Sequence, residues 1–174
     1  ISVGGSSAGG NMALSLSARL GSERIKSCFA LYPAAHLTHP ERLDTVMGCV
    51  SDKFRSGVVI PHWCMKLFIN AYTTPGTDMN DPRLSPMFYD ASKFPKYVAV
   101  ACGDADTLYR MSFDLMKKIS GSASGTNVDG SRKFICVLNE AHEFNTFGRT
   151  RASQEERDRV EGEAINMIRA SWRQ

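Results

Sequence analysis

The sequence predicts an α/β fold built on a partial, doubly wound and mostly parallel sheet. Short, nearly continuous apolar runs alternate with segments of helical periodicity along most of the 174 residues. Apolar runs of this kind are typical of parallel strands that are covered on both faces. A regular alternation of strands and helices is the pattern of doubly wound sheets.

The first predicted elements are a strand that leads into a helix. Residues 1–3 belong to the strand, and residues 8–20 have the spacing of a helix that we expect to end at Gly21. The next strand covers residues 25–32 and stops at Pro33. The apolar stripe of the helix consists of Met12, Leu16 and Leu20.

Residues 36–75 interrupt this alternation. They combine turns with a helix predicted at residues 61–72, which Pro61 opens because proline suits the first position of a helix. The apolar side chains around this helix are unusually large: Ile60, Trp63, Leu67 and Phe68.

The alternation then resumes to the end of the chain. We expect a strand at residues 96–102, a helix at about 108–119, a connector at 120–131 and a strand at 133–138. The connector is rich in glycine and serine but carries neither G-K-[ST] nor G-x-G-x-x-G, so it is no phosphate-binding loop. A last amphipathic helix runs from about residue 154 to 172, and its apolar side consists of Val160, Ala164, Met167, Ile168 and Trp172.

The composition is that of an ordinary globular protein and argues against several functional classes. Hydrophobic residues make up 43% and charged residues 22% of the chain, and the net charge is only +3. No dense run of Lys and Arg is present, so we expect no nucleic-acid partner. No apolar run approaches the roughly 20 residues that a membrane helix needs, so we predict no membrane segment in this chain. The oligomeric state leaves no signal in the sequence.

The cysteines give no sign of a metal or redox site. They contain no C-x-x-C pair, and we therefore expect no metal and no cofactor. An odd count favours free thiols and a reducing compartment such as the cytoplasm, although a pair between residues 49 and 64 stays open. Three of the five lie in predicted strands, where thiols pack as small hydrophobic groups; the full set is Cys28, Cys49, Cys64, Cys102 and Cys136.

The most informative motif is Gly5-Ser6-Ser7-Ala8-Gly9, a G-x-S-x-G between the first strand and the first helix. In a nucleophile elbow, a serine occupies a strained turn in this context, and small neighbours let the backbone fold tightly around it. Ser7 is therefore the candidate nucleophile. The backbone N–H of Ala8, which follows it, is a candidate oxyanion-hole donor.

A serine nucleophile needs a base, and the base needs an acid that orients it. Asp104 and Asp106 follow the strand at 96–102, and His142 follows the strand at 133–138. These positions give the chain order of serine, acid and histidine, and each lies just after a strand, where catalytic groups of parallel sheets gather. The other histidines lie in a loop or at a helix start: His36, His39 and His62.

Four stretches resemble the hormone-sensitive-lipase group of α/β-hydrolases, and the resemblance spans nearly the whole chain. They are residues 4–11 around the elbow, the loop Asp81-Pro82-Arg83-Leu84-Ser85-Pro86, Asp106-Thr107-Leu108 and His142-Glu143-Phe144. The resemblance implies that Ser7 is the nucleophile, that Asp106 is the acid of a D-x-L motif and that His142 is the histidine of an H-x-F motif. Asp104 is then a residue that stabilises the loop.

The chain also departs from this group. Ser6 stands where the group usually carries an acidic residue, and Glu143 stands where it often carries glycine. The group has a longer first half with an H-G-G motif that completes the oxyanion hole, which implies that residues 1–174 are the carboxyl-terminal part of a single α/β-hydrolase domain. Loss of one oxyanion donor costs on the order of a hundred- to a thousandfold in turnover, so the isolated chain is expected to be a poor catalyst.

By the same resemblance, residues 36–75 are a helical cap insertion over the site. Large apolar side chains of this segment are candidates for the substrate pocket. Packing within a cap helix is the more common role of such side chains, and the two roles are not exclusive. The candidates are Trp63, Leu67, Phe68 and Tyr72, with Met65 beside them.

Together these features predict a serine hydrolase that cleaves a small-molecule carboxylic ester with a small to medium hydrophobic group. Triad geometry does not separate esters from activated amides or formamides. Two alternatives remain: a non-catalytic ligand-binding or receptor module on a hydrolase scaffold, and an inactive truncated fragment.

Overall fold

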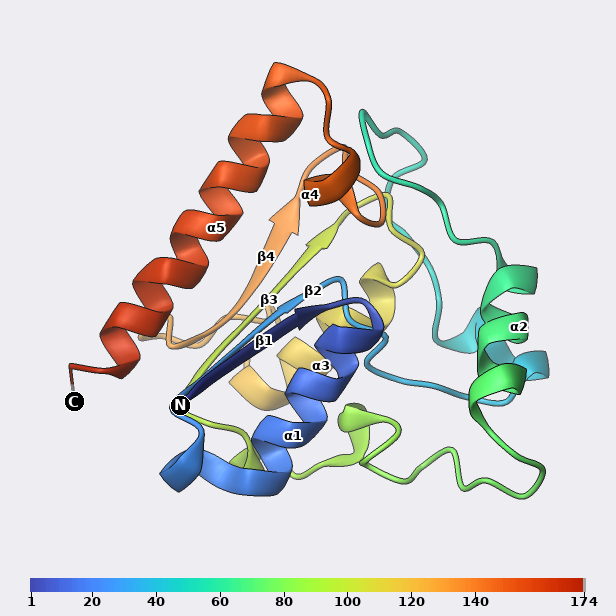
Figure 1. Cartoon of the computed structure of the whole chain (residues 1–174), viewed down its shortest axis with the longest axis horizontal. Coiled ribbons are helices and arrows are strands. Elements are labelled where there is room, and N and C mark those ends of the chain that lie inside the picture. Colours follow the sequence, from blue (N-terminus) through green and yellow to red (C-terminus); the bar gives the residue numbers. More distant parts are fainter. Residues whose placement is uncertain (174) are drawn as a thin grey trace.

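A computed structural model describes residues 1–173 as a four-stranded parallel sheet with helices on both faces (Figure 1). The strands are β1 (Ser2–Ser6), β2 (Ser27–Leu31), β3 (Tyr97–Gly103) and β4 (Arg132–Val137). Their order in the sheet is the order in the chain, and each strand is parallel to its neighbours. The predicted α/β class with a parallel sheet is confirmed.

The helices are α1 (Ala8–Arg24), α2 (His62–Tyr72), α3 (Tyr109–Ser120), α4 (Phe144–Phe147) and α5 (Arg151–Ser171). In Figure 1, α1 and α3 cover one face of the sheet, and α5 crosses the other. Three short 3₁₀ helices and α4 lie in segments where the sequence predicted no helix. The 3₁₀ helices are η1 (Pro40–Thr45), η2 (Pro86–Phe88) and η3 (Ala91–Lys93).

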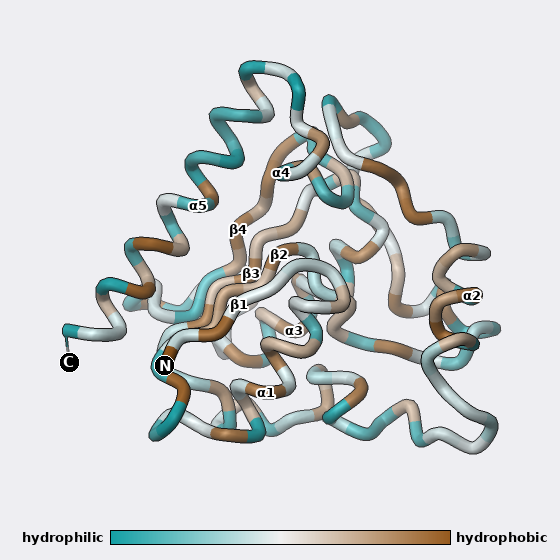
Figure 2. The backbone as a smooth tube through the Cα atoms, in the orientation of Figure 1, coloured by the Kyte–Doolittle hydropathy of each residue, from teal (hydrophilic) through white to brown (hydrophobic). Residues whose placement is uncertain are grey.

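The core has two layers because alternate residues of a strand point to opposite faces. Val98 and Val100 of β3 pack with Leu14 of α1 and Leu115 of α3. Ala99 and Ala101, the residues between them, belong to the layer under α5. Figure 2 shows the hydrophobic strands in the centre of the molecule and α5 as largely hydrophilic, as expected for a helix with one buried side.

The apolar stripe of α1 faces away from the sheet, contrary to the usual reading of such a stripe. Met12, Leu16 and Leu20 are 56%, 44% and 36% exposed, whereas Leu14 is buried against the strands. Small residues mark the side that packs on the sheet, since a Cβ atom at Gly10 would lie only 3.2 Å from the carbonyl oxygens of Gly5 in β1 and Leu31 in β2. The close approach of α1 to the strands selects these small residues.

The predicted end of the first helix at Gly21 coincides with a break in the helical backbone. Gly21 has φ 73° and ψ 172°, and a further turn beyond this kink reaches Arg24. At the end of α5, Trp172 is exposed and donates a hydrogen bond from its ring nitrogen to Ser2 Oγ at 3.2 Å. Of the other predicted apolar residues of α5, Val160, Met167 and Ile168 pack against the sheet as expected, and Ala164 is buried.

The segment at residues 36–75 contributes no strand to the sheet. Its main element is α2, which lies beside η1 at the side of the molecule away from α5 (Figure 1). The predicted helix at 61–72 is confirmed, with Pro61 at the N-cap of α2. Across residues 1–173, no helix combines the length and the apolar character that spanning a membrane would require.

Candidate active site

The carboxyl ends of three strands carry the predicted catalytic side chains to one edge of the sheet. β1 ends at Ser6, β3 at Gly103 and β4 at Val137, and the turns that follow hold residues 7, 106 and 142. Because the strands are parallel and in register, these turns meet although they are up to 135 residues apart in sequence.

Ser7 occupies a strained turn between β1 and α1. Its φ of 52° and ψ of −118° are uncommon for a residue with a side chain. The Ser7 N–H donates to Leu31 O at 2.9 Å, and the Ser7 carbonyl accepts from Asn11 N at 3.0 Å. Backbone bonds to β2 and to the first turn of α1 therefore hold the strained conformation and fix the direction of the hydroxyl.

The two motif glycines have different roles in this turn, and this gives a test of the elbow. A Cβ atom at Gly5 would lie 2.4 Å from Gly9 O, whereas a Cβ atom at Gly9 would meet nothing within 4 Å. We expect Gly5→Ala to lower the free energy of unfolding by about 1–3 kcal/mol, as overpacked cores do. The matched variant Gly9→Ala is expected to cause no loss, because alanine favours a helix over glycine. Urea denaturation compares the two, and equal stabilities would contradict the tight turn.

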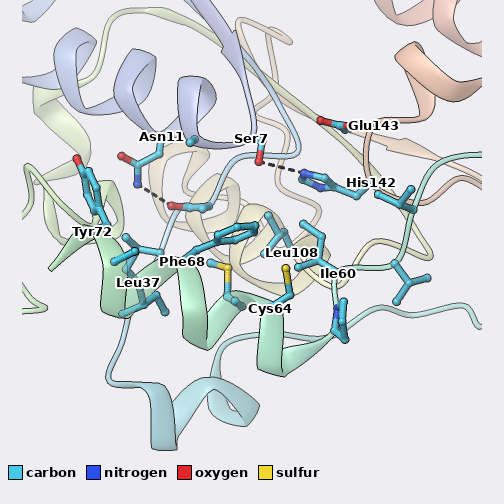
Figure 3. Close-up of a pocket in the computed structure, with 18 of the residues that line it drawn as sticks. Ser7, Asn11, Leu37, Ile60, Cys64, Phe68, Tyr72, Leu108, His142 and Glu143 are labelled. Atoms are coloured by element: carbon cyan, nitrogen blue, oxygen red, sulfur yellow. Dashed lines mark hydrogen bonds between the residues drawn. The ribbon is translucent and has the colours of Figure 1, made fainter.

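A hydrogen-bonded chain joins the three predicted side chains. His142 Nε2 lies 3.0 Å from Ser7 Oγ, and His142 Nδ1 lies 2.8 Å from Asp106 Oδ2 (Figure 3 shows the first of these bonds). Asp106 is fully buried, and its other oxygen accepts the N–H of Leu108 at 2.8 Å. His142 is 3% exposed. In this arrangement the carboxylate orients the ring, and the free ring nitrogen faces the hydroxyl.

Two neighbours that sequence reasoning missed hold His142 in place. Val58 pairs with its backbone, donating to His142 O at 2.8 Å and accepting from His142 N at 3.0 Å. The ring of Tyr32 packs on the imidazole with 4.5 Å between centroids, and the Tyr32 hydroxyl hydrogen-bonds to Asn145 Oδ1. Burial is the main cause that raises the pKa of Tyr32 to about 12, so this support is a neutral phenol at physiological pH.

The structure places the other candidate side chains away from the imidazole. Asp104 Oδ1 accepts the N–H of Asn139 at 2.7 Å, and its carbonyl accepts two N–H groups from residues 50 and 51. It therefore ties loops together. His36 packs edge-on against Phe88, and burial lowers its pKa. Among residues 1–173 no group of three His, Cys, Asp or Glu side chains is placed to hold a metal ion, and all five cysteines are free thiols.

A cavity of about 690 Å³ opens beside the Ser7 hydroxyl and lies between α1 and α2. Figure 3 shows Phe68 and Tyr72 among its lining side chains, close to Leu37 and Leu108. Other α2 residues point elsewhere: Trp63 and Leu67 are 68% and 59% exposed and do not line the cavity. Because a helix repeats every 3.6 residues, one side of α2 faces the cavity, and positions 63 and 67 lie outside it. The α2 positions that line the cavity are 64, 65, 68, 69, 71 and 72.

The backbone N–H of Ala8 lies at the first turn of α1. N–H groups in the first turn of a helix have no acceptor within it, and the positive end of the helix dipole favours negative charge there. Ala8 also lines the cavity. It is thus the candidate oxyanion donor that the described residues supply.

The loop at residues 81–86 supports the elbow from outside the sheet. Asn11, in the first turns of α1, donates from Nδ2 to Leu84 O at 2.9 Å and to Ala34 O at 2.7 Å. Ser15 Oγ donates to Arg83 O at 3.1 Å. These bonds join α1 to the loop and hold the first turns of the helix next to the elbow.

The parallel sheet, the serine turn after β1 and the hydrogen-bonded imidazole place this chain in the class of α/β-hydrolases. The sequence matches the family described as "alpha/beta hydrolase fold" over residues 1–145, and the chain belongs to this family. The resemblance drawn from the motifs is thereby confirmed. No curated protein matches the chain.

Solved structures of esterases share the fold. EstE1, a thermophilic carboxylesterase from a metagenomic library, is 22% identical with a TM-score of 0.72, over 96% of this chain and 54% of its own. Brefeldin A esterase, a bacterial homologue of human hormone-sensitive lipase, is 22% identical with a TM-score of 0.66, over 97% and 48%. The esterase of the archaeon Pyrobaculum calidifontis is 19% identical with a TM-score of 0.67, over 96% and 52%. The chain thus spans about half the length of these enzymes.

Proposed function

We propose that the protein carrying this chain is a serine hydrolase that cleaves carboxylic esters through an acyl-enzyme. The observation that supports this most strongly is the pair of hydrogen bonds that joins Ser7, His142 and Asp106, at 3.0 and 2.8 Å, at the mouth of an apolar cavity. The esterase names of the structural neighbours agree with it.

In the proposed reaction His142 Nε2 takes the proton from Ser7 Oγ as that oxygen attacks the ester carbonyl carbon. The Ala8 N–H stabilises the oxyanion of the tetrahedral intermediate. His142 then donates its proton to the departing alkoxide, which leaves as the alcohol, and the acyl group stays on Ser7. Water then gives a proton to His142 as it attacks the acyl carbonyl carbon. The second tetrahedral intermediate collapses as His142 returns that proton to Ser7 Oγ, which releases the acid and restores the serine hydroxyl. Asp106 orients the ring and stabilises the imidazolium throughout.

We further propose that the chain is the carboxyl-terminal part of one hydrolase domain and that residues 36–75 are its cap. The cavity supports the second point, because α2 forms one of its walls opposite Ser7. Oxyanion donors beyond Ala8 then come from sequence outside this chain, so activity tests need the protein in its natural length.

A fluorophosphonate probe tests the proposal directly, because it phosphonylates activated serines. We expect the natively folded protein to be labelled at Ser7, as located by peptide mass spectrometry, and to hydrolyse p-nitrophenyl butyrate. A native protein that is neither labelled nor active would favour the non-catalytic ligand-binding alternative. Labelling without turnover would point to an incomplete oxyanion hole.

The two sides of α2 give a matched pair of variants for the substrate pocket. Phe68 lines the cavity, whereas Trp63 on the same helix does not. Loss of an aromatic contact to an acyl chain is worth one to two kcal/mol by area, so we expect Phe68→Ala to lower kcat/KM for p-nitrophenyl hexanoate about tenfold. Trp63→Ala is expected to change it less than about twofold. Equal effects of the two substitutions would remove Phe68 from the pocket.

A further inference from the structure

Glu143 brings a carboxylate to a cavity that is lined mostly by apolar side chains. Of the described residues that line the cavity, Glu143 is the one acid, and none is a lysine or an arginine. Its side chain is half-buried, and within residues 1–173 no cationic nitrogen lies within 4.0 Å of its carboxylate. The cavity therefore holds a negative charge that the described part of the protein does not neutralise.

Backbone contacts fix the main chain of Glu143 next to His142. Glu143 has φ 58°, in the left-handed region, and caps the start of α4. Its carbonyl accepts N–H groups from Thr146 and Phe147 at 3.0 Å each, and the preceding residue is bound to Val58. Its charge already acts within the site: burial is the larger cause of the raised pKa of Tyr32, and the Glu143 carboxylate adds to it.

The chemistry of ester cleavage decides which part of a substrate meets Glu143. The departing alcohol must receive its proton from His142 Nε2, so it leaves on the imidazole side of the reacting carbon. Glu143 directly follows His142 in the chain. In Figure 3 it lies on the opposite side of the Ser7–His142 bond from Phe68 and Cys64. With this geometry the acyl group of the substrate lies against the apolar wall that α2 forms, and the alcohol leaves past the Glu143 carboxylate.

We propose that Glu143 is a specificity-determining residue that selects esters with an apolar acyl group and a cationic alcohol part, and disfavours esters with an anionic alcohol part. The proposal rests on the proposed esterase function and adds the substrate class. Charge pairs at a half-exposed site change rate constants by roughly five- to tenfold, which sets the expected effect.

Three butyrate esters of similar size test this in a pH-stat assay: butyrylcholine, its neutral isostere 3,3-dimethylbutyl butyrate, and the butyrate ester of 3-hydroxypropanoate. We expect kcat/KM for butyrylcholine to exceed that of the neutral ester about five- to tenfold, with the anionic ester slowest. In Glu143→Gln the cationic and neutral esters are expected to become equal within about twofold. Added salt should reduce the ratio in the unmodified protein, since exposed charges are screened.

Glu23→Gln is the matched control. It removes one exposed carboxylate from the last turns of α1, roughly 20 Å along that helix from Ser7. This variant should keep the cationic preference of the unmodified protein. Hydrolysis with the same ratio in the unmodified protein and in Glu143→Gln overturns this inference alone. A natively folded protein that hydrolyses none of the three esters overturns the proposed function, and the inference with it.

Discussion

Ser7→Ala is expected to lower kcat for ester hydrolysis by roughly four to six orders of magnitude and to abolish fluorophosphonate labelling. The attacking oxygen is lost, and only binding and oxyanion stabilisation remain to speed attack by water. The fold should persist, because the hydrogen bond that the Ser7 hydroxyl makes, to His142 Nε2, faces the open cavity. Removal of the hydroxyl therefore buries no unpaired group that water cannot reach.

Ser6→Ala is the matched comparison for this experiment. Ser6 directly precedes Ser7 as the last residue of β1, is exposed, and has no hydrogen bond to His142. We expect this variant to stay labelled at Ser7 and active within a few-fold of the unmodified protein. Urea denaturation of both variants separates loss of chemistry from loss of fold. If Ser7→Ala keeps more than about a tenth of the activity while folded, residue 7 is not the nucleophile.

The three residues of the hydrogen-bonded chain could be predicted from the sequence because they depend on topology. In a parallel sheet the carboxyl ends of all strands lie at one edge, so polar residues directly after apolar runs must come together. Ser7 and His142 each follow a strand by only a few residues. Position after a strand does not distinguish Asp104 from Asp106, since both are buried beside the same loop. The D-x-L resemblance selects Asp106, the residue that contacts the imidazole.

Which side of a helix is buried could not be predicted from the sequence with equal success. On α1 the apolar stripe of Met12, Leu16 and Leu20 points outward, because close packing on the sheet selects small residues on the buried side. On α2 the sequence offers large apolar residues on more than one side. Only the packing of α2 in the folded protein brings Phe68 to the cavity and leaves Trp63 outside.

The residues that hold His142 in place could not be predicted from the sequence for a related reason. Val58 and Tyr32 lie far from residue 142 in the chain, in segments with no periodic pattern that links them to it. Glu140 is the clearest case. A glutamate close to a strand end is typical of the protein surface. Glu140 is instead fully buried, and it accepts hydrogen bonds from Ser56, 84 positions earlier in the chain, and from Ser153, 13 positions later.

The Glu140 carboxylate joins three segments of the chain around the imidazole. Oε1 accepts hydrogen bonds from Arg55 Nε at 3.1 Å and from Ser153 Oγ at 2.9 Å, and Oε2 accepts one from Ser56 Oγ. Ser153 belongs to the first turn of α5, and Ser56 lies in the segment that continues to Val58. The same carboxylate thus anchors α5, the 55–58 segment and the turn that carries His142.

Glu140→Ala is therefore expected to lower the free energy of unfolding by about 3–5 kcal/mol. The substitution leaves two buried hydroxyl groups without their acceptor, at about 1–3 kcal/mol each, and the partly exposed Arg55 guanidinium without its ion partner. Glu140→Gln keeps the shape and one acceptor oxygen and should lose less than Glu140→Ala. The matched control is Glu155→Ala, where an exposed acid pairs with Arg151 on the surface of α5 and a change within about 0.5 kcal/mol is expected.

Urea denaturation of the three variants measures these differences, and thermal unfolding should show the Glu140→Ala midpoint roughly 10 °C lower. Activity adds a second readout. Because the 55–58 segment holds the backbone of His142, we expect kcat of folded Glu140→Ala to fall as the imidazole loses its position, whereas Glu155→Ala should retain it. Equal stabilities of Glu140→Ala and Glu155→Ala would mean that the buried carboxylate does not anchor the turn, and the position of His142 would then depend on Asp106, Tyr32 and Val58 alone.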